Sequence, residues 1–170
     1  NPPYKHTIYF FTRLCNGERN ADKLLRDRVM QRLGVSDTRN ESFLFRDEYE
    51  GWKQRQQIVN CINRVELKQA EELLADYKRR VSVENKLEQQ FCLVMEIQIM
   101  ILQGYEENLL KKQIERALKL TVPNIDKKSL HDLMLSEQEM DLVLEYARYC
   151  YPEKMAEYCR ILLEYIKQHI

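Results

Sequence analysis

Glycine and proline are scarce in this chain, whose 170 residues include only four of each. A β-sandwich or β-barrel needs many turns, which these two residues usually supply, so the composition excludes both folds. Long apolar runs are missing too: residues 91–102 form the longest, are interrupted by Glu96 and Gln98, and fall short of the ~18 residues that span a bilayer. Because 44% of the residues are hydrophobic, the chain can still bury a core. We therefore expect an all-α protein with no membrane segment.

The motifs of common enzyme classes are absent as well. The sequence has no GxGxxG or Walker loop for a nucleotide, no HExxH for zinc and no GxSxG for a serine nucleophile. Carboxylate pairs such as Glu71 and Glu72 are sequence neighbours, which point in different directions around a helix. His131 follows a leucine and fits a surface histidine better than a catalytic base. We predict that the protein is not an enzyme and binds no metal or cofactor.

The cysteines indicate a reducing compartment. They are odd in number, widely spaced and without a CxxC motif: Cys15, Cys61, Cys92, Cys150 and Cys159. This pattern favours buried thiols over disulfides or structural zinc. The chain has no signal peptide, and it begins at Asn1 rather than Met, so we expect a cytoplasmic protein with further residues upstream.

The net charge is zero, but it is unevenly distributed. Residues 1–40 contain eight Lys/Arg and four Asp/Glu, a balance of +4, whereas the remaining residues contain 19 and 23, a balance of −4. Such asymmetry is typical of a basic head that meets an anion and an acidic body that does not. Ordinary solvated helix faces produce the same asymmetry, and we give that interpretation the greater weight.

Helical periodicity runs through nearly the whole chain and predicts two regions. The head, residues 1–36, should contain helices over 5–15 and 21–33. The body, residues 37–170, should contain helices over 42–63, 66–80, 84–103, 106–121, 127–134, 137–150 and 153–169. These pair as antiparallel hairpins in a tetratricopeptide-like array, although an irregular helical bundle fits the pattern almost equally well.

Particular residues place several of these helices. Helix 84–103 is apolar on most sides and should lie centrally, and Gly104 should end it. Ser136 and Glu139 form a capping box that should open helix 137–150. The last helix should bury Leu162, Leu163 and Ile166.

The head resembles the second half of a phage-repressor-type helix-turn-helix domain. The resemblance spans about residues 7–36 and depends on the stretch Arg13-Leu14-Cys15-Asn16-Gly17-Glu18-Arg19 and on Leu33-Gly34-Val35-Ser36. It implies a recognition helix whose DNA-facing residues are Lys5, Thr7, Tyr9, Arg13 and Arg19. The first helices of such a domain are not in this chain, so we expect DNA binding only if an upstream segment completes the head.

Head and body together resemble the Rgg- and PlcR-type regulators of Gram-positive bacteria and related regulators of gut clostridia. Residues 68–77 and 117–123 look like the body of the latter group. The resemblance implies a homodimer whose body binds a short peptide and transmits occupancy to the head. The alternative is a protein-interaction scaffold without DNA binding. Tyr9, Phe10 and Phe11 distinguish the two, because a scaffold would pack them against the body and a DNA reader would expose them.

A peptide backbone would be bound by side-chain amides, which donate and accept at once. The candidates on the inner helices are Gln56, Asn60, Asn63, Gln90 and Gln98. Ordinary solvent-facing amides are the alternative, and the one we weigh higher. Tyr146 and Tyr149 are similarly open to two interpretations, as a pocket wall or as the rim of the core.

Overall fold

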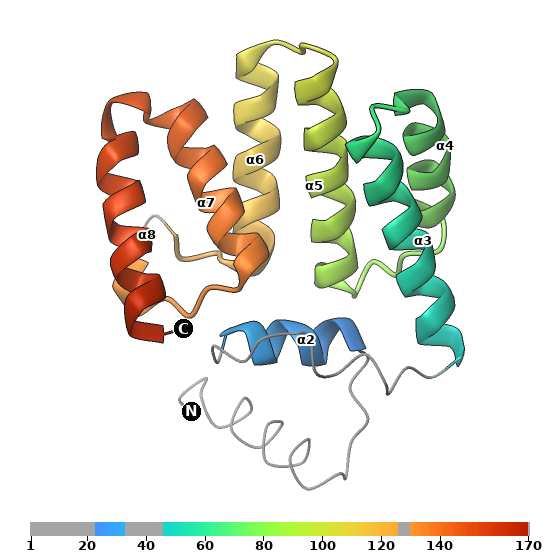
Figure 1. Cartoon of the computed structure of the whole chain (residues 1–170), viewed down its shortest axis with the longest axis horizontal. Coiled ribbons are helices and arrows are strands. Elements are labelled where there is room, and N and C mark those ends of the chain that lie inside the picture. The colour runs from blue at the N-terminus through green and yellow to red at the C-terminus, as the bar shows by residue number, and fades with distance from the viewer. Residues whose placement is uncertain (1–22, 33–45, 126–129, 170) are drawn as a thin grey trace, which may run out of the picture.

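The computed structural model describes residues 23–32, 46–125 and 130–169, and within these ranges every regular element is helical (Figure 1). The all-α prediction is thus confirmed. The α-helices are α2 (Lys23–Arg32), α3 (Arg46–Asn63), α4 (Leu67–Lys78), α5 (Lys86–Leu102), α6 (Glu107–Thr121), α7 (Glu137–Cys150) and α8 (Met155–His169). Two short 3₁₀ helices, η2 (Leu130–Asp132) and η3 (Pro152–Lys154), lie in the connections before α7 and α8. No helix within the described ranges is long and apolar enough to cross a membrane.

Consecutive helices pack side by side as antiparallel hairpins. The pairs α3–α4, α5–α6 and α7–α8 stand next to one another, and neighbouring pairs contact through α4 with α5 and through α6 with α7 (Figure 1). Helix α3 also contacts α5, so the first helices of adjacent hairpins touch. This arrangement agrees with the predicted array of antiparallel helical hairpins. The likeness of the array to tetratricopeptide repeats stays a prediction.

Helix α5 joins two apolar cores, as its sequence predicts. One core lies between α5, α6, α7 and α8 and includes Leu93 and Ile97 of α5. The other lies between α3, α4 and α5 and includes Phe91 and Ile99. Because these residues point to both flanks, α5 has neighbours on two sides, and the expectation that it lies centrally is confirmed.

Two helices end in the same left-handed turn. After α5, Gly104 has φ = 72°, its N–H donates to the Ile101 carbonyl, and the next N–H donates to the Met100 carbonyl. After α3, Val65 occupies the equivalent position with φ = 60°. Glycine adopts this conformation freely and a β-branched residue does not. Gly104 therefore ends α5 as predicted, whereas the turn at Val65 carries backbone strain.

The last hairpin agrees with the sequence at its start and departs from it on its outer face. The capping box of Ser136 and Glu139 is present, and α7 begins at Glu137. In α8, Leu162 is buried, but Leu163 is 59% exposed and Ile166 is 39% exposed. The prediction that α8 buries the latter two residues is therefore wrong, because α8 lies at the end of the described array and packs there against α7, η2 and η3 only with its other side.

Candidate functional site

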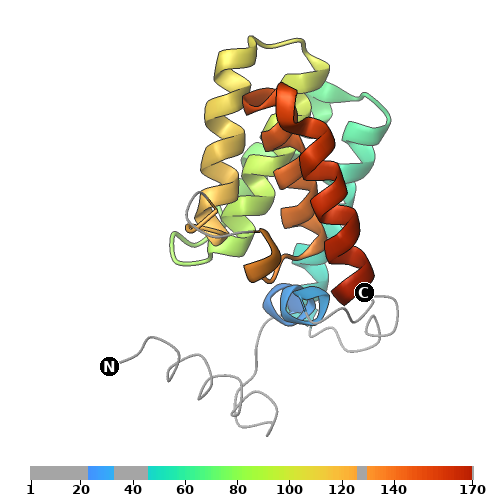
Figure 2. The ribbon, with the colours of Figure 1, turned by 90° about the vertical axis from the view of Figure 1, so that its left-hand side faces the viewer.

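Helix α2, the part of the predicted head that the structure describes, lies across one end of the array. In Figure 1 it runs crosswise below α5, α6 and α7, and in Figure 2 it is seen nearly end-on at the base of the same helices. It contacts α5 and reaches the start of α7 through hydrogen bonds. The head and body are thus joined by a specific contact.

Arg28 is the centre of this contact. Its side chain is only 4% exposed, and its Nη1 donates to the Gln90 amide oxygen at 2.9 Å and to the Ser136 hydroxyl at 2.8 Å. Its Nη2 donates to the Gln138 amide oxygen at 2.5 Å. Burial lowers the pKa of Arg28, while Glu139, 3.6 Å from Nη1, acts in the opposite direction. An arginine remains charged in such surroundings.

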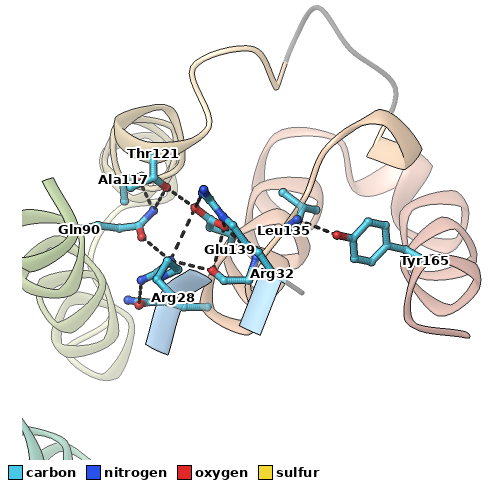
Figure 3. A network of polar contacts seen from close by, with 10 residues as sticks. Arg28, Arg32, Gln90, Ala117, Thr121, Leu135, Glu139 and Tyr165 are labelled. Atoms are coloured by element: carbon cyan, nitrogen blue, oxygen red, sulfur yellow. Dashed lines mark hydrogen bonds and ion pairs between the residues drawn. The ribbon is translucent and has the colours of Figure 1, made fainter. Parts of the chain in front are cut away.

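Arg32, one turn further along α2, binds both carboxylate oxygens of Glu139 through one edge of its guanidinium group. Its Nη2 donates to one carboxylate oxygen at 2.5 Å and its Nε donates to the other at 3.1 Å (Figure 3). Glu139 is fully buried, whereas Arg32 is about one-third exposed at 32%. Bidentate pairs of this kind combine charge with a fixed geometry and are among the stronger hydrogen-bonded contacts in proteins.

The array supplies further partners that fix these acceptors. The Gln90 amide nitrogen donates to the Ala117 carbonyl at 3.0 Å and to the Thr121 hydroxyl at 2.7 Å. The Thr121 hydroxyl in turn donates to Glu139 at 2.6 Å (Figure 3). Side chains of α5, α6 and α7 are therefore connected to one another as well as to α2.

Glu139 also caps the helix on which it stands. The Ser136 backbone N–H and hydroxyl each donate to it at 2.8 Å. Burial raises the pKa of Glu139, but the hydrogen bonds and charge of Arg32, together with those from Thr121 and Ser136, outweigh that effect and leave the pKa below its ordinary value. The carboxylate is therefore ionised at neutral pH and faces the positive end of the α7 dipole.

We call the receptor for α2 the arginine site; it consists of Gln90, Thr121, Ser136, Gln138 and Glu139. The acceptor oxygens of Gln90, Ser136, Gln138 and Glu139 converge on two guanidinium groups and carry one full negative charge, while Thr121 binds Gln90 and Glu139. Within the described ranges no group of His, Cys, Asp and Glu could hold a metal ion. Recognition of a cation by charge and geometry is thus what this arrangement can do.

The predicted ligand-binding amides are divided by the structure. Gln56, Asn60 and Asn63 are exposed on α3, and Gln98 is half-buried on α5. Gln90 is fully buried, and its amide is engaged by Arg28, Ala117 and Thr121. Gln90 therefore belongs to the arginine site and not to an open groove with the other amides.

The remaining predicted residues are placed as follows. The predicted DNA-facing residues Lys5, Thr7, Tyr9, Arg13 and Arg19 lie outside the described residues, as do Phe10 and Phe11. Tyr146 is a buried member of the apolar core between α5 and α8, and Tyr149 packs against it. These two tyrosines therefore have the core role rather than that of a pocket wall.

An open groove of about 620 Å³ lies elsewhere, between α4, α5 and α6. Leu74, Ile99 and Met100 give it an apolar floor, and charged residues such as Glu71 stand at its rim. Gln113 also lines it, and its Oε1 atom is buried without a hydrogen-bond partner. None of the five predicted ligand-binding amides lines this groove.

Sequence analysis missed the arginine site as a site. Arg28 and Arg32 were counted only as charges of the head, and Glu139 only as a helix cap. A usable signal is present, since two arginines four positions apart lie on one face of a helix. Comparison gives no independent identification, because no family model, curated protein or solved structure matches this chain.

Proposed function

We propose that the array is the ligand-sensing and dimerisation region of a cytoplasmic bacterial transcription regulator of the helix-turn-helix plus tetratricopeptide-like type. The observation that supports this most is the arginine site. It holds a helix of the head through Gln90 on α5 and Glu139 on α7, and Thr121 on α6 binds both of these side chains. A contact of this kind allows the state of the body to affect the position of α2.

The mechanism is a shift of populations between two arrangements. A ligand that binds better when α2 is free, or when α5, α6 and α7 are differently placed, changes how firmly α2 is held. Because α2 follows the recognition helix in the resembled domain, its position would set that of the DNA-reading surface. The ligand we expect is a short peptide, for which Gln56, Asn60 and Asn63 remain exposed candidates on α3.

DNA binding and dimerisation complete the proposal. The DNA contacts are assigned to Lys5, Thr7, Tyr9, Arg13 and Arg19, and they require an upstream segment that completes the head. The exposed Leu163 and Ile166 on α8 offer an apolar face to a second copy. Terminal helices of repeat arrays normally present a polar outer face, so this exposure supports dimerisation.

The test uses the product of the complete reading frame, including everything encoded before Asn1. It is incubated with random-sequence duplex DNA, and the bound fraction is amplified and sequenced. We expect enrichment of a two-fold symmetric site with half-sites about one or two helical turns apart. If the protein unfolds cooperatively, and is therefore folded, an unchanged DNA pool would refute sequence-specific DNA binding.

The second candidate function is a protein-interaction scaffold without DNA binding. The groove between α4, α5 and α6 favours it, because its apolar floor and the unpartnered Gln113 Oε1 suit a partner that brings a donor. In this function α2 is a packing element that closes the end of the array. Selection of random DNA separates the two candidates, since the scaffold enriches none.

A further inference from the structure

Helix α2 is held by its arginines rather than by an apolar face. Of the α2 side chains that the structure describes, only Arg28 is fully buried, whereas Leu25, Val29 and Met30 remain partly exposed. No described side chain of α2 belongs to either apolar core. Every other α-helix described contributes at least one buried or half-buried apolar side chain to these cores. Among the described side chains of α2, the specific contacts with the array are therefore the polar ones of Arg28 and Arg32.

The packing beside α2 is also incomplete. A cavity of about 440 Å³ opens between Leu25 of α2 and the start of α5, where Asn85 and Leu87 line it. Because this cavity is open to the surface, the side of α2 that carries Leu25 is not closed off by the array there. A helix held in this way can leave without opening a core.

The arginine site is matched to a guanidinium and depends on one. The two ion pairs of Glu139 among the described residues both come from α2, at 3.6 Å from Arg28 and 2.5 Å from Arg32. If α2 leaves, a carboxylate at the start of α7 loses its counter-charges, which is costly unless water or another cation replaces them. The acceptors are spread around planar forks, a geometry that a lysine ammonium does not reproduce.

We propose that the arginine site is the ligand site of the sensor and takes a peptide that carries two arginines four positions apart on one helical face. Such a peptide competes directly with Arg28 and Arg32, so binding of the ligand and release of α2 are one event. This inference rests on the proposed sensing function and names its ligand chemistry. It requires no change in the shape of the array, because the arginines of the ligand take the positions of Arg28 and Arg32.

The probe is a synthetic peptide with the sequence of residues 23–32, acetylated, amidated and labelled for fluorescence anisotropy. The proteins are the whole chain, its Arg28→Ala/Arg32→Ala variant and an Arg79→Ala/Arg160→Ala variant. Arg79 and Arg160 are exposed, and among the described residues their ion pairs are with carboxylates within one helical turn, so the last variant is a matched control for lost charge. In the unaltered chain the tethered α2 competes at a high effective concentration.

We expect the Arg28→Ala/Arg32→Ala variant to bind the probe more tightly than the unaltered chain and the control variant, because its own α2 competes less well for the arginine site. The gain should be at least about tenfold, since a single charged hydrogen bond of the competing α2 is worth about that factor. A probe with lysine at both arginine positions should bind this variant about tenfold more weakly, because the fork geometry is lost. Adding Glu139→Gln to it should weaken the arginine probe by at least about tenfold. Equal binding by all three proteins, or equal binding of both probes, overturns the proposal.

A second measurement uses the unaltered chain, so the answer does not depend on the folding of a variant. Hydrogen exchange of residues 23–32 is followed while the unlabelled arginine probe is added in excess. We expect faster exchange in α2 and unchanged exchange in α3 and α4, with no effect of the lysine probe. An α2 that stays protected at saturating probe overturns the proposal. These readouts involve no DNA, so they can fail while the DNA selection succeeds, and the reverse.

Discussion

The Arg28 guanidinium donates a 2.8 Å hydrogen bond to the Ser136 hydroxyl and so joins two residues that are 108 positions apart. Ser136 is the N-cap of α7, and its backbone N–H donates to Glu139 within the capping box. The docking of α2 and the start of α7 are therefore parts of one polar unit. Changes at Glu139 should affect both.

Replacement of Glu139 tests this unit. Glu139→Ala removes the Glu139 half of the capping box and leaves Arg28 buried without its counter-ion, so we expect the free energy of unfolding to fall by about 3–5 kcal/mol. Glu139→Gln should cost less, because glutamine also completes a capping box. Urea unfolding followed by circular dichroism measures both. Glu157→Ala, in the exposed first turn of α8, is the control and should change stability by less than about 1 kcal/mol. Similar losses for Glu139→Ala and Glu157→Ala would show that the buried pair contributes nothing.

The lowered pKa of Glu139 gives a second prediction, on acid stability. A carboxyl group whose pKa is lower when folded than when unfolded adds stability above its unfolded pKa, about 4.3 for glutamate, and loses it as the pH falls through the folded pKa. The difference in unfolding free energy between the unaltered chain and Glu139→Gln should therefore be constant near neutral pH. It should narrow below about pH 4.3. Urea unfolding from pH 3 to pH 7 measures it, and a difference that widens in acid would contradict the sign.

Much of the fold could be predicted because its determinants are local. The capping box of Ser136 and Glu139 fixes the start of α7, and Gly104 fixes the end of α5. The apolar surface of α5 required neighbours on both sides, which the two cores provide. In each case the deciding residues lie within a few positions of one another, so periodicity and capping rules apply directly.

The arginine site could not be predicted in the same way, because its members are distant in sequence. Arg28 is 62 positions from Gln90 and 110 positions from Gln138. A charge pattern treats Arg28 as solvated, and only the three-dimensional position of α2 turns it into a buried donor. Gln90 was predicted as a ligand-binding amide, whereas its place beneath α2 makes it an internal acceptor. The spacing of Arg28 and Arg32 shows that they share a helix face, but it does not show which distant residues accept their hydrogen bonds.

The turn after α3 supplies a third prediction. Val65 has φ = 60°, a backbone conformation that costs a residue with a Cβ about 1–2 kcal/mol. A glycine at this position avoids most of this strain but loses about 0.5–1 kcal/mol of conformational entropy on folding. Val65→Gly should therefore stabilise the chain by about 0.5–1 kcal/mol and raise the Tm by about 2–4 °C per kcal/mol. Differential scanning calorimetry measures it. The matched control is Gly104→Ala in the equivalent turn after α5, where a Cβ meets nothing within 4 Å and backbone strain alone should lower the Tm. A lower Tm for Val65→Gly would mean that its side chain stabilises the fold.

The exposed face of α8 supplies the last prediction, on assembly. Leu163 and Ile166 are one turn apart, and both were expected in the core, yet Leu163 is more exposed than any other large apolar residue of α8. If this face binds a second copy, Leu163→Glu places a charge in an apolar contact and should shift the dimer to monomer by at least about tenfold in dissociation constant. Sedimentation equilibrium over a range of protein concentrations measures the shift. Leu102→Glu, on an exposed apolar residue of α5, should leave the dissociation constant unchanged. An unaltered chain that is monomeric at every concentration, or a dimer indifferent to Leu163→Glu, removes α8 from the interface.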